Sequence, residues 1–270
     1  MNEISNKVVN MKIDFPSVIN LVKQAAVEEL LSRFTRVSSK TKVDGSLVTE
    51  ADLSMQNRLE TELLQSFPET VLLSEEMSIE DQALAFNSGK PIWCLDPLDG
   101  TSNFAGSIPY FAVSLSLIYN YKVIMGLVFD PVRDECFFAE ENSPAFLNNN
   151  KIEITNNITD INNAIAIIDY KRLDNDLSVR LVKDKPYASQ RNFGASALDW
   201  CWLAVNRGHM YLHGKQNIWD YSAGNFIFEK AGGSSCTLDG DTIFKSKLEG
   251  RSVVAAINKS LFSDWFNYIK

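Results

Sequence analysis

The chain has 270 residues, of which 45% are hydrophobic and 22% are charged, and its formal net charge is −8. This composition is typical of a globular protein that buries a core, and the acidic balance argues against direct nucleic-acid binding, which needs a basic surface. The first ten residues lack the basic start and apolar core of a signal peptide, and no apolar run reaches membrane-spanning length. We therefore expect a cytoplasmic protein without membrane attachment.

The first part of the chain predicts two long helices. Apolar residues at helical spacing predict one over residues 15–34, with Asp14 as its cap and Pro16 in its first turn. Residues 36–46 are polar and predict a loop or a hairpin. The second helix should begin at Thr49. Its expected buried side carries Leu53, Leu59, Leu63, Leu64 and Phe67.

Short apolar runs predict strands through the middle of the chain. They cover residues 71–74, 92–95, 111–119, 123–129 and 135–139, and a hairpin is expected over 145–152. Further on we expect strands over 164–168 and 253–257, and helices over 195–206, 221–231 and 260–268. This alternation predicts a layered α/β or α+β fold. The four cysteines lie far apart, which favours free thiols over a zinc site or disulfides.

The most informative segment is Trp93 to Phe104. Its apolar strand leads to Asp96, and Asp99 and Gly100 follow three and four residues later. Pro97 has no N–H, so we expect the chain to turn there and to aim both carboxylates at one point. Asp-Pro and Asp-Gly are also ordinary turn dipeptides. Converging carboxylates beside open backbone amides would suit a hard cation that holds a phosphate.

Other acidic groups accompany this segment. Glu75 follows the apolar run 71–73, Asp220 follows Trp219 in a Trp-Asp-x-x-Ala-Gly pattern, and Asp52 closes a Val-Thr-x-x-Asp pattern. With Asp-Pro-Leu-Asp-Gly-Thr-Ser-Asn-Phe, these blocks resemble the inositol monophosphatase family of magnesium-dependent, lithium-sensitive phosphatases. The resemblance implies the α-β-α-β-α sandwich of the sugar phosphatases and a homodimer. It also implies a single domain over 1–270, with a metal-binding half of about 1–155 and a second half of about 156–270.

The resemblance also implies roles for the acidic residues. Glu75, Asp96 and the carbonyl of Leu98 would hold a first magnesium ion. Asp96, Asp99 and Asp220 would hold a second, so that two to three ions occupy the site, the third held weakly near Glu75.

The remaining implied roles concern phosphate and the attacking water. Backbone amides at Gly100 and Thr101 would bind phosphate, and Asp99 and Asp220 would also contact the substrate. Thr101 and Asp52 would orient the attacking water. Asp52 has a structural alternative, because Thr49 to Asp52 also fits a capping box at a helix start.

His213 departs from the family pattern. Inositol phosphatases often carry a glutamate seven residues before the position of Asp220, and it contacts substrate hydroxyls. His213 is either a surface residue or part of a changed substrate pocket. In the second case, His213→Glu should favour inositol 1-phosphate over substrates with a second anionic group. Ser196 would line the same pocket or cap the following helix.

The resemblance thus predicts hydrolysis of a small phosphate monoester, inositol 1-phosphate or a related polyol or sugar phosphate. Histidinol phosphatase, fructose-1,6-bisphosphatase and nucleotide 3′-phosphatase are alternatives with the same chemistry. A regulatory binding partner without catalysis is an alternative of another kind, because some bacterial relatives bind the transcription machinery.

Overall fold

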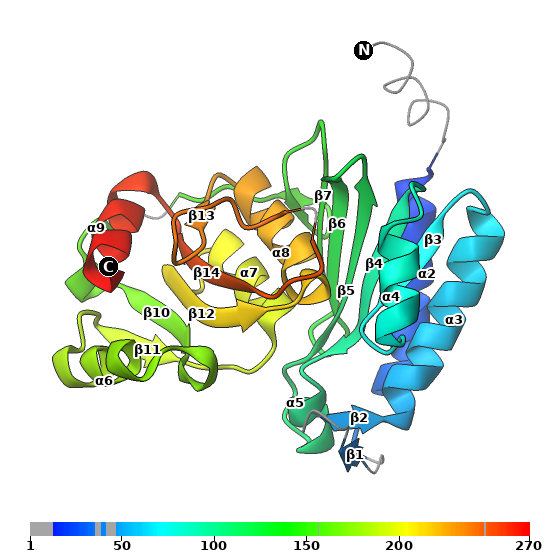
Figure 1. Cartoon of the computed structure of the whole chain (residues 1–270), viewed down its shortest axis with the longest axis horizontal. Helices are drawn as coiled ribbons and strands as arrows, with labels where there is room; N and C mark the ends of the chain where they lie inside the picture. The colour runs from blue at the N-terminus through cyan, green and yellow to red at the C-terminus, as the bar shows by residue number, and fades with distance from the viewer. Residues whose placement is uncertain (1–12, 36–38, 42–46, 156, 246) are drawn as a thin grey trace.

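The structure is a computed structural model that describes residues 13–35, 39–41, 47–155, 157–245 and 247–270. Figure 1 shows five layers, in the order helices, sheet, helices, sheet, helices. The predicted layered α/β sandwich is therefore confirmed. No helix within the described ranges is long and apolar enough to cross a membrane. All four cysteines are free and buried.

The first helical layer consists of α2 (Phe15–Ala25), its π-helical continuation η1 (Ala26–Leu31) and α3 (Glu50–Ser66). The predicted helix over 15–34 is thus confirmed over most of its length, with a change to π-helical hydrogen bonding in its second half. Asp14 occupies the N-cap position, but its carboxylate accepts from the Ser17 hydroxyl and not from a backbone N–H. The side-chain cap expected of Asp14 is therefore wrong.

Helix α3 begins where the sequence predicts, directly after its N-cap Thr49. Leu59 and Leu63 are buried as expected, whereas Leu53 is 46% exposed. Strands β1 (Ser39–Thr41) and β2 (Leu47–Thr49) pair antiparallel just before α3. Residues 36–38 and 42–46 of the predicted loop or hairpin lie outside the described residues.

The larger sheet has seven strands in the order β3-β4-β5-β6-β7-β8-β9. They are β3 (Val71–Ser74), β4 (Ile92–Asp99), β5 (Ala112–Tyr119), β6 (Lys122–Asp130), β7 (Glu135–Glu140), β8 (Phe146–Leu147) and β9 (Asn150–Lys151). All the strands predicted in this region are confirmed. β3 and β4 run parallel, and the other neighbours are antiparallel. Helices α4 (Ile79–Phe86) and α5 (Thr101–Ala105) follow β3 and β4, and neither was predicted.

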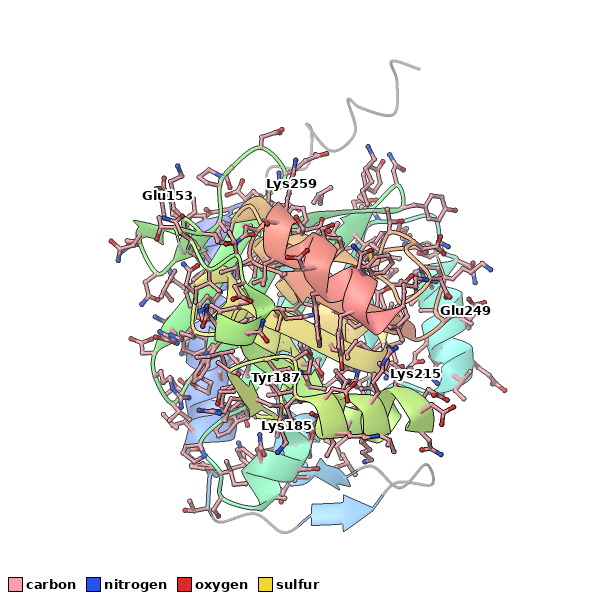
Figure 2. All side chains as sticks on the ribbon, turned by 90° about the vertical axis from the view of Figure 1, so that its left-hand side faces the viewer. Glu153, Lys185, Tyr187, Lys215, Glu249 and Lys259 are labelled. Carbon is pink, nitrogen blue, oxygen red and sulfur yellow. The ribbon has the colours of Figure 1, made fainter. Side chains whose placement is uncertain are left out.

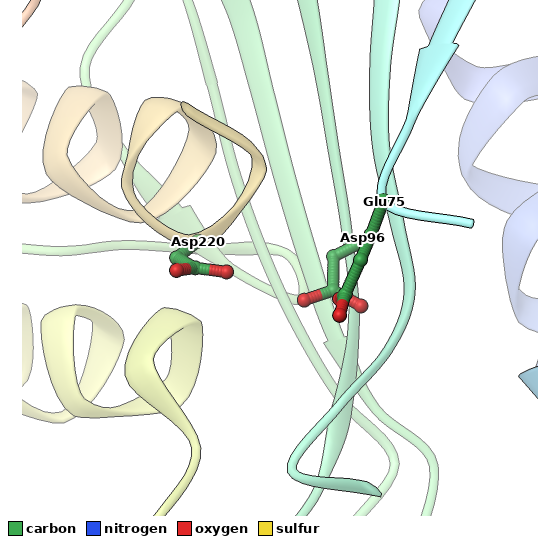
Figure 3. Close-up of side chains that lie close together, drawn as sticks. All are labelled: Glu75, Asp96 and Asp220. Atoms are coloured by element: carbon green, nitrogen blue, oxygen red, sulfur yellow. The ribbon is translucent and has the colours of Figure 1, made fainter. Parts of the chain in front are cut away.

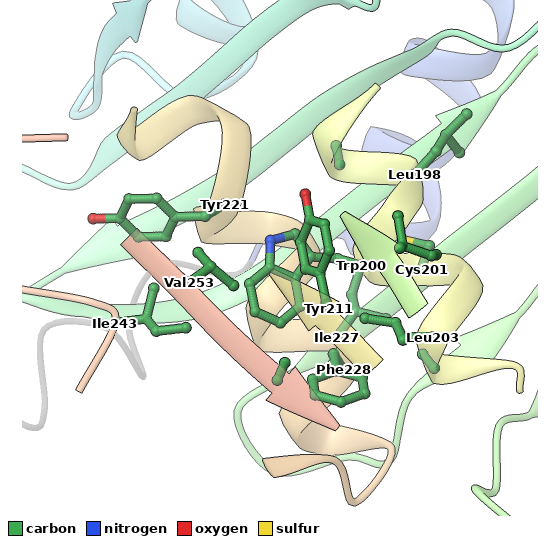
Figure 4. Packing of buried hydrophobic residues seen from close by; sticks show 14 of the residues in the cluster. Leu198, Trp200, Cys201, Leu203, Tyr211, Tyr221, Ile227, Phe228, Ile243 and Val253 are labelled. Atoms are coloured by element: carbon green, nitrogen blue, oxygen red, sulfur yellow. The ribbon is translucent and has the colours of Figure 1, made fainter. Parts of the chain in front are cut away.

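The middle helical layer contains α7 (Ser196–Ala204) and α8 (Ile218–Lys230), both near their predicted positions. The smaller sheet has the order β11-β10-β12-β14-β13. Its strands are β10 (Ile165–Asp169), β11 (Ser189–Arg191), β12 (Met210–Gln216), β13 (Ser234–Cys236) and β14 (Arg251–Ala256). Figure 4 shows Trp200, Phe228 and Tyr211 packed together in the core between these layers.

The outer layer consists of α6 (Asn175–Asp184) and α9 (Lys259–Ile269) (Figure 1). Single turns of 3₁₀-helix precede and follow β10, namely η2 (Ile161–Asn163) and η3 (Tyr170–Arg172). The strands β10 and β14 and the helix α9 were predicted, whereas α6, β11, β12 and β13 were not. Of the elements that were not predicted, β12 carries His213 into the interior of the protein.

Candidate active site

The sequence predicts that strand β4 ends at Leu95. In the structure it continues to Asp99, with an irregularity after Asp96. Asp96 pairs with Ser114 and Asp99 pairs with Ala112, so β4 has one residue more than its partner between these two pairs. Pro97 is tolerated here because a bulge needs no ladder N–H at that position. A bulge also re-aims the neighbouring side chains. The expected turn after Asp96 is therefore a β-bulge inside the strand.

Glu75 lies beside Asp96 because β3 and β4 are parallel neighbours. Their carboxyl ends meet at one edge of the sheet, where Ser74 pairs with Leu95. The N–H of Glu75 donates to the carbonyl of Leu95 over 3.3 Å. Glu75 and Asp96 are the residues directly after this last pair. They thus come together although they lie about twenty positions apart in the sequence.

Asp220 reaches the same edge from the first turn of α8. Its Oδ2 accepts from the N–H of Asn217 over 2.7 Å in a capping box, which fixes the carboxylate at the helix start. The hydroxyl of Ser114, the strand partner of Asp96, donates to the carbonyl of Trp219 over 2.9 Å. This bond ties the start of α8 to the sheet directly beside Asp96.

Ligand atoms of Glu75, Asp96 and Asp220 all lie within 4.8 Å of one another. Figure 3 shows the three carboxylates pointing into one space between β3, β4 and α8. Oxygen-only donors of this kind suit a hard divalent cation such as Mg²⁺. The donor set present in the protein therefore fits the metal that the sequence implies.

The raised pKa values of the carboxylates also indicate a cation site. Burial, followed by the charges of Glu75, Asp99 and Asp220, raises the pKa of Asp96 well above its ordinary value. Burial and the charge of Glu75 likewise raise the pKa of Asp220, and burial raises that of Asp99 to about 7. Carboxylates whose pKa values are raised by burial and by one another are costly to ionise without a cation.

We expect Mg²⁺ to stabilise the protein more near pH 7.5 than near pH 5.5. A carboxyl group whose pKa is higher in the folded than in the unfolded chain binds more protons in the folded state. Without metal, the free energy of unfolding therefore falls as the pH rises from the unfolded-state pKa to the folded-state pKa. At higher pH the carboxylates are free to bind Mg²⁺. The measurement is the Tm with chelator and with Mg²⁺ at both pH values.

Asp220→Asn is the control for this experiment, because it removes one carboxylate of the cluster. It should shrink the Mg²⁺-induced rise in Tm near pH 7.5. Equal rises at the two pH values in the unmodified protein would contradict the assignment of these carboxylates as metal ligands.

Asp99 is placed differently from the other three carboxylates. Its Oδ1 accepts from the N–H of Ser196 over 3.1 Å and its Oδ2 from that of Ala197 over 2.6 Å. Asp99 therefore caps the start of α7 and links it to β4. It lines the same cavity as Asp96, but it does not belong to the group whose ligand atoms lie within 4.8 Å. Its role as a metal ligand stays a prediction.

Asp52 caps a helix and also contacts Thr101. Its Oδ2 accepts from the N–H and the hydroxyl of Thr49, at 2.7 and 2.6 Å, and so completes the capping box of α3. Its Oδ1 lies 3.1 Å from the hydroxyl of Thr101, which is also 3.0 Å from the carbonyl of Leu98. One carboxylate thus fixes a helix start and holds the hydroxyl of Thr101.

Gly100 and Ser196 both line the cavity. Gly100 has φ 91°, and a Cβ there would lie 3.1 Å from the Tyr110 carbonyl, so both backbone conformation and space favour glycine. Ser196 is the first residue of α7, one position past the N-cap Ala195, and Asp99 caps the helix in its place. Of the two alternatives for Ser196, capping of α7 is therefore wrong, whereas its place at the cavity agrees with the other.

His213 is not a surface residue, since only 5% of it is exposed and it lines the cavity. Its Nδ1 accepts from the N–H of Lys215 over 3.1 Å, and its Nε2 lies 3.3 Å from Oδ2 of Asp169. Both ring nitrogens therefore have partners within the protein.

The cavity has a volume of about 350 Å³ and includes residues that the sequence analysis missed. They are Asp169, Lys171, Arg172, Asn192, Asp199, Lys215 and Asn217. Asp199 is buried and accepts from the Tyr110 hydroxyl over 3.0 Å, and its burial raises its pKa. Asp169 could have been found, because it follows the predicted strand 164–168 just as Glu75 and Asp96 follow theirs.

Comparison with known proteins gives a consistent result. The family model of the inositol monophosphatase family matches residues 15–265. The chain is 28% identical to the fructose-1,6-bisphosphatase/inositol-1-monophosphatase of Thermotoga maritima over 240 residues, 85% of this chain and 90% of that protein. It is 28% identical to the Nus factor SuhB of Vibrio cholerae over 236 residues, 85% of each chain. The crystal structure of the extragenic suppressor protein suhB from Bartonella henselae superposes with a TM-score of 0.82 at 26% identity, covering 94% of this chain and 98% of that one.

Proposed function

This chain belongs to the inositol monophosphatase family, and we propose that it is a magnesium-dependent phosphatase acting on inositol 1-phosphate or a related polyol or sugar phosphate. The observation that carries the proposal is the convergence of Glu75, Asp96 and Asp220 within 4.8 Å on one cavity. A cavity of about 350 Å³ suits one small phosphorylated molecule.

Glu75, Asp96, Asp220, the carbonyl of Leu98 and Asp99 are the groups that we propose to hold two to three Mg²⁺ ions. When bound, Mg²⁺ neutralises phosphate, lowers the pKa of the attacking water and stabilises the leaving oxygen. The five groups supply oxygen donors only, and the Asp96 side chain is 2% exposed.

The rest of the chemistry belongs to the residues around β4 and α5. Asp52 holds the hydroxyl of Thr101 from behind, so that this hydroxyl can accept and orient the attacking water. The backbone N–H groups of Gly100 and Thr101 begin a short helix on the cavity wall. Unpaired N–H groups at such a position can donate to phosphate oxygens.

A second candidate substrate has its own support. The exposed cations Lys171, Arg172 and Lys215 line the cavity together with the acidic cluster. In Figure 2, Lys215 lies among the side chains seen between α6 and α9. A substrate with a second anionic group, such as fructose 1,6-bisphosphate, would satisfy these cations. The Thermotoga maritima relative is named for both activities.

The regulatory alternative rests on the relative named Nus factor SuhB. Binding a protein partner does not require the metal-binding carboxylates, whereas Glu75, Asp96, Asp99 and Asp220 are all present and face one cavity. We therefore favour catalysis, in a homodimer without direct contacts to nucleic acid. Histidinol phosphate and nucleotide 3′-phosphates are the remaining substrates to compare.

We expect Li⁺ to inhibit the enzyme, with Na⁺ as the matched control salt. Li⁺ is small and binds oxygen donors, but it carries half the charge of Mg²⁺, so it should occupy the weakest metal position and retain phosphate. The inhibition should be uncompetitive with respect to substrate. Initial rates over a range of Li⁺ and substrate concentrations measure it, and rates equal to those in Na⁺ would contradict it.

A panel of phosphate monoesters assayed with Mg²⁺ tests the proposed substrate class. The panel consists of inositol 1-phosphate, fructose 1,6-bisphosphate, histidinol phosphate and a nucleotide 3′-phosphate. Highest kcat/KM on inositol 1-phosphate or on the sugar bisphosphate supports the proposal. Highest kcat/KM on the nucleotide would replace it with the nucleotidase alternative.

A further inference from the structure

Asp169 brings a carboxylate into the cavity from the smaller sheet. It is the last residue of β10, and the parallel pairing of β10 with β12 sets it beside His213. Nε2 of His213 lies 3.3 Å from Oδ2 of Asp169. The Asp169 side chain is 23% exposed, whereas that of His213 is 6% exposed. The carboxylate is therefore the member of the pair that is more accessible from the cavity.

The backbone around this pair is closely packed. A Cβ on Gly214 would lie 1.6 Å from the carbonyl oxygen of Arg172, so only glycine fits where η3 crosses β12. The N–H of Lys171, within η3, donates to Oδ1 of Asp169 over 2.8 Å. Asp169 is thus held by the backbone of η3 on one oxygen and by the imidazole on the other.

The imidazole has no remaining group for a substrate. Since Nδ1 of His213 accepts from the N–H of Lys215 over 3.1 Å, the ring proton is assigned to Nε2, where it faces Asp169. A carboxylate offers about four lone-pair positions, and the two bonds to Lys171 and His213 use only part of them. Asp169 can therefore still accept a hydrogen bond, and His213 cannot.

The charge of Asp169 also favours its role as a hydrogen-bond acceptor. The hydrogen bond from His213 lowers its pKa, although partial burial opposes this. Arg172 adds a smaller lowering effect. An ionised carboxylate is only an acceptor, so its partner in the cavity has to be a donor such as a hydroxyl group.

We propose that Asp169 binds a hydroxyl group of the substrate's polyol or sugar, and that His213 is the positioning residue for Asp169. The inference rests on the proposed function, because it concerns the leaving group of the same reaction. Inositol phosphatases often carry a glutamate at the position of His213. In this chain the carboxylate comes instead from Asp169 on the neighbouring strand β10, which pairs directly with His213.

This arrangement changes what His213→Glu should do. The new glutamate would face Asp169, and two carboxylates this close cannot both ionise without repulsion. The single substitution should therefore weaken inositol 1-phosphate hydrolysis, contrary to the expectation from the sequence. Asp169→Asn combined with His213→Glu should restore it, because the carboxylate then comes from β12.

The experiment compares kcat/KM for inositol 1-phosphate with kcat/KM for para-nitrophenyl phosphate, whose leaving group carries no further hydroxyl. Asp169→Asn should lower this ratio about tenfold or more, because a charged, partly buried acceptor for a substrate hydroxyl is replaced by a neutral amide with a single acceptor oxygen. His213→Glu should lower it as well, and the double variant should return to within about threefold of the unmodified protein. His213→Gln, which keeps a donor toward Asp169, should retain most of the ratio.

Asp176→Asn is the matched control, since it makes the same chemical change at an exposed position of α6 outside the cavity. Its ratio should equal that of the unmodified protein. A ratio unchanged in Asp169→Asn, or a double variant no better than its parents, would overturn this inference alone. If the unmodified protein hydrolyses neither ester, the proposed function fails and this inference fails with it. Thermal melts identify any variant that does not fold, and His213→Gln then still tests the role of the pair.

Discussion

Asp96→Asn should lower kcat/KM for the proposed hydrolysis by about a thousandfold or more, which corresponds to about 4 kcal/mol of transition-state stabilisation. Asp96 lies beside Glu75, which directly follows the parallel strand β3, and opposite Asp220 on α8. Loss of its charge should therefore weaken every metal position that it shares. Steady-state kinetics with saturating Mg²⁺ measures the effect.

Asp96→Asn should also leave the metal-free protein at least as stable as the unmodified one. Asparagine can still accept the bond that Leu98 N–H donates to Asp96 Oδ1 over 3.0 Å. It also removes a buried carboxylate whose pKa is raised by burial and by its acidic neighbours. The Tm in chelator distinguishes loss of metal binding from loss of the folded structure as the cause of inactivity. Full activity in this variant, or a large fall in its Tm, would contradict the role given to Asp96.

Thr101→Ala should lower kcat by about a hundredfold to ten-thousandfold, the range expected when a group that positions a reacting proton is removed. The hydroxyl of Thr101 lies 3.1 Å from Oδ1 of Asp52, and Thr101 lines the cavity. Asp52→Asn should have a similar effect on kcat. It should also reduce the free energy of unfolding by about 1 kcal/mol, because Asp52 completes the capping box of α3.

Thr49→Ala separates catalysis from capping. It removes the N-cap hydroxyl that bonds to Asp52 Oδ2 and to the N–H of Ala51, but it leaves Thr101 in place. Thermal melts should show a loss of about 0.5 to 2 kcal/mol, with a much smaller fall in kcat than in Thr101→Ala. If Thr49→Ala and Asp52→Asn lose kcat equally, or if Thr101→Ala keeps kcat, Asp52 has only a capping role.

The acidic residues of the candidate site could be predicted because each follows a local signal. Glu75 and Asp96 follow short apolar strands, and Thr49 to Asp52 has the spacing of a capping box. The bulge at Pro97 could not be predicted, because it depends on the register of β4 against β5. A sequence pattern marks the strand but not the partner that opposes each residue.

His213 was considered for the substrate pocket, but the strand that carries it was missed because that strand has a weak pattern. β12 contains His213, Gly214 and Lys215, and glycine and charged residues are depleted in strands. β12 is buried because it lies between β10 and β14 in the sheet and because helices α7 and α9 pack against it. His213 and Asp169 are 44 positions apart and meet through the register of β10 against β12. No local sequence pattern predicts this contact.

The helices α4 and α6 were missed as well. α4 has no buried residue, and Ile79 and Leu84 are 84% and 71% exposed. α6 buries only Leu181 and exposes Val179 and Val182. The apolar residues of α4 do not mark a buried face, so hydrophobic spacing gives no helical signal there. In α6, by contrast, Leu177 and Leu181 lie four residues apart on the side that packs against the core, and this signal was overlooked. Leu53, predicted on the buried side of α3 and found exposed, is the reverse case.

We propose that this protein hydrolyses a small phosphate monoester with the help of a divalent metal. The most direct measurement is the release of phosphate from inositol 1-phosphate by the chelator-treated protein as Mg²⁺ is added back. We expect negligible release without the metal and a saturable rise with Mg²⁺. Release that persists after thorough chelation would contradict this proposal, as would no release from any ester of the panel at any Mg²⁺ concentration.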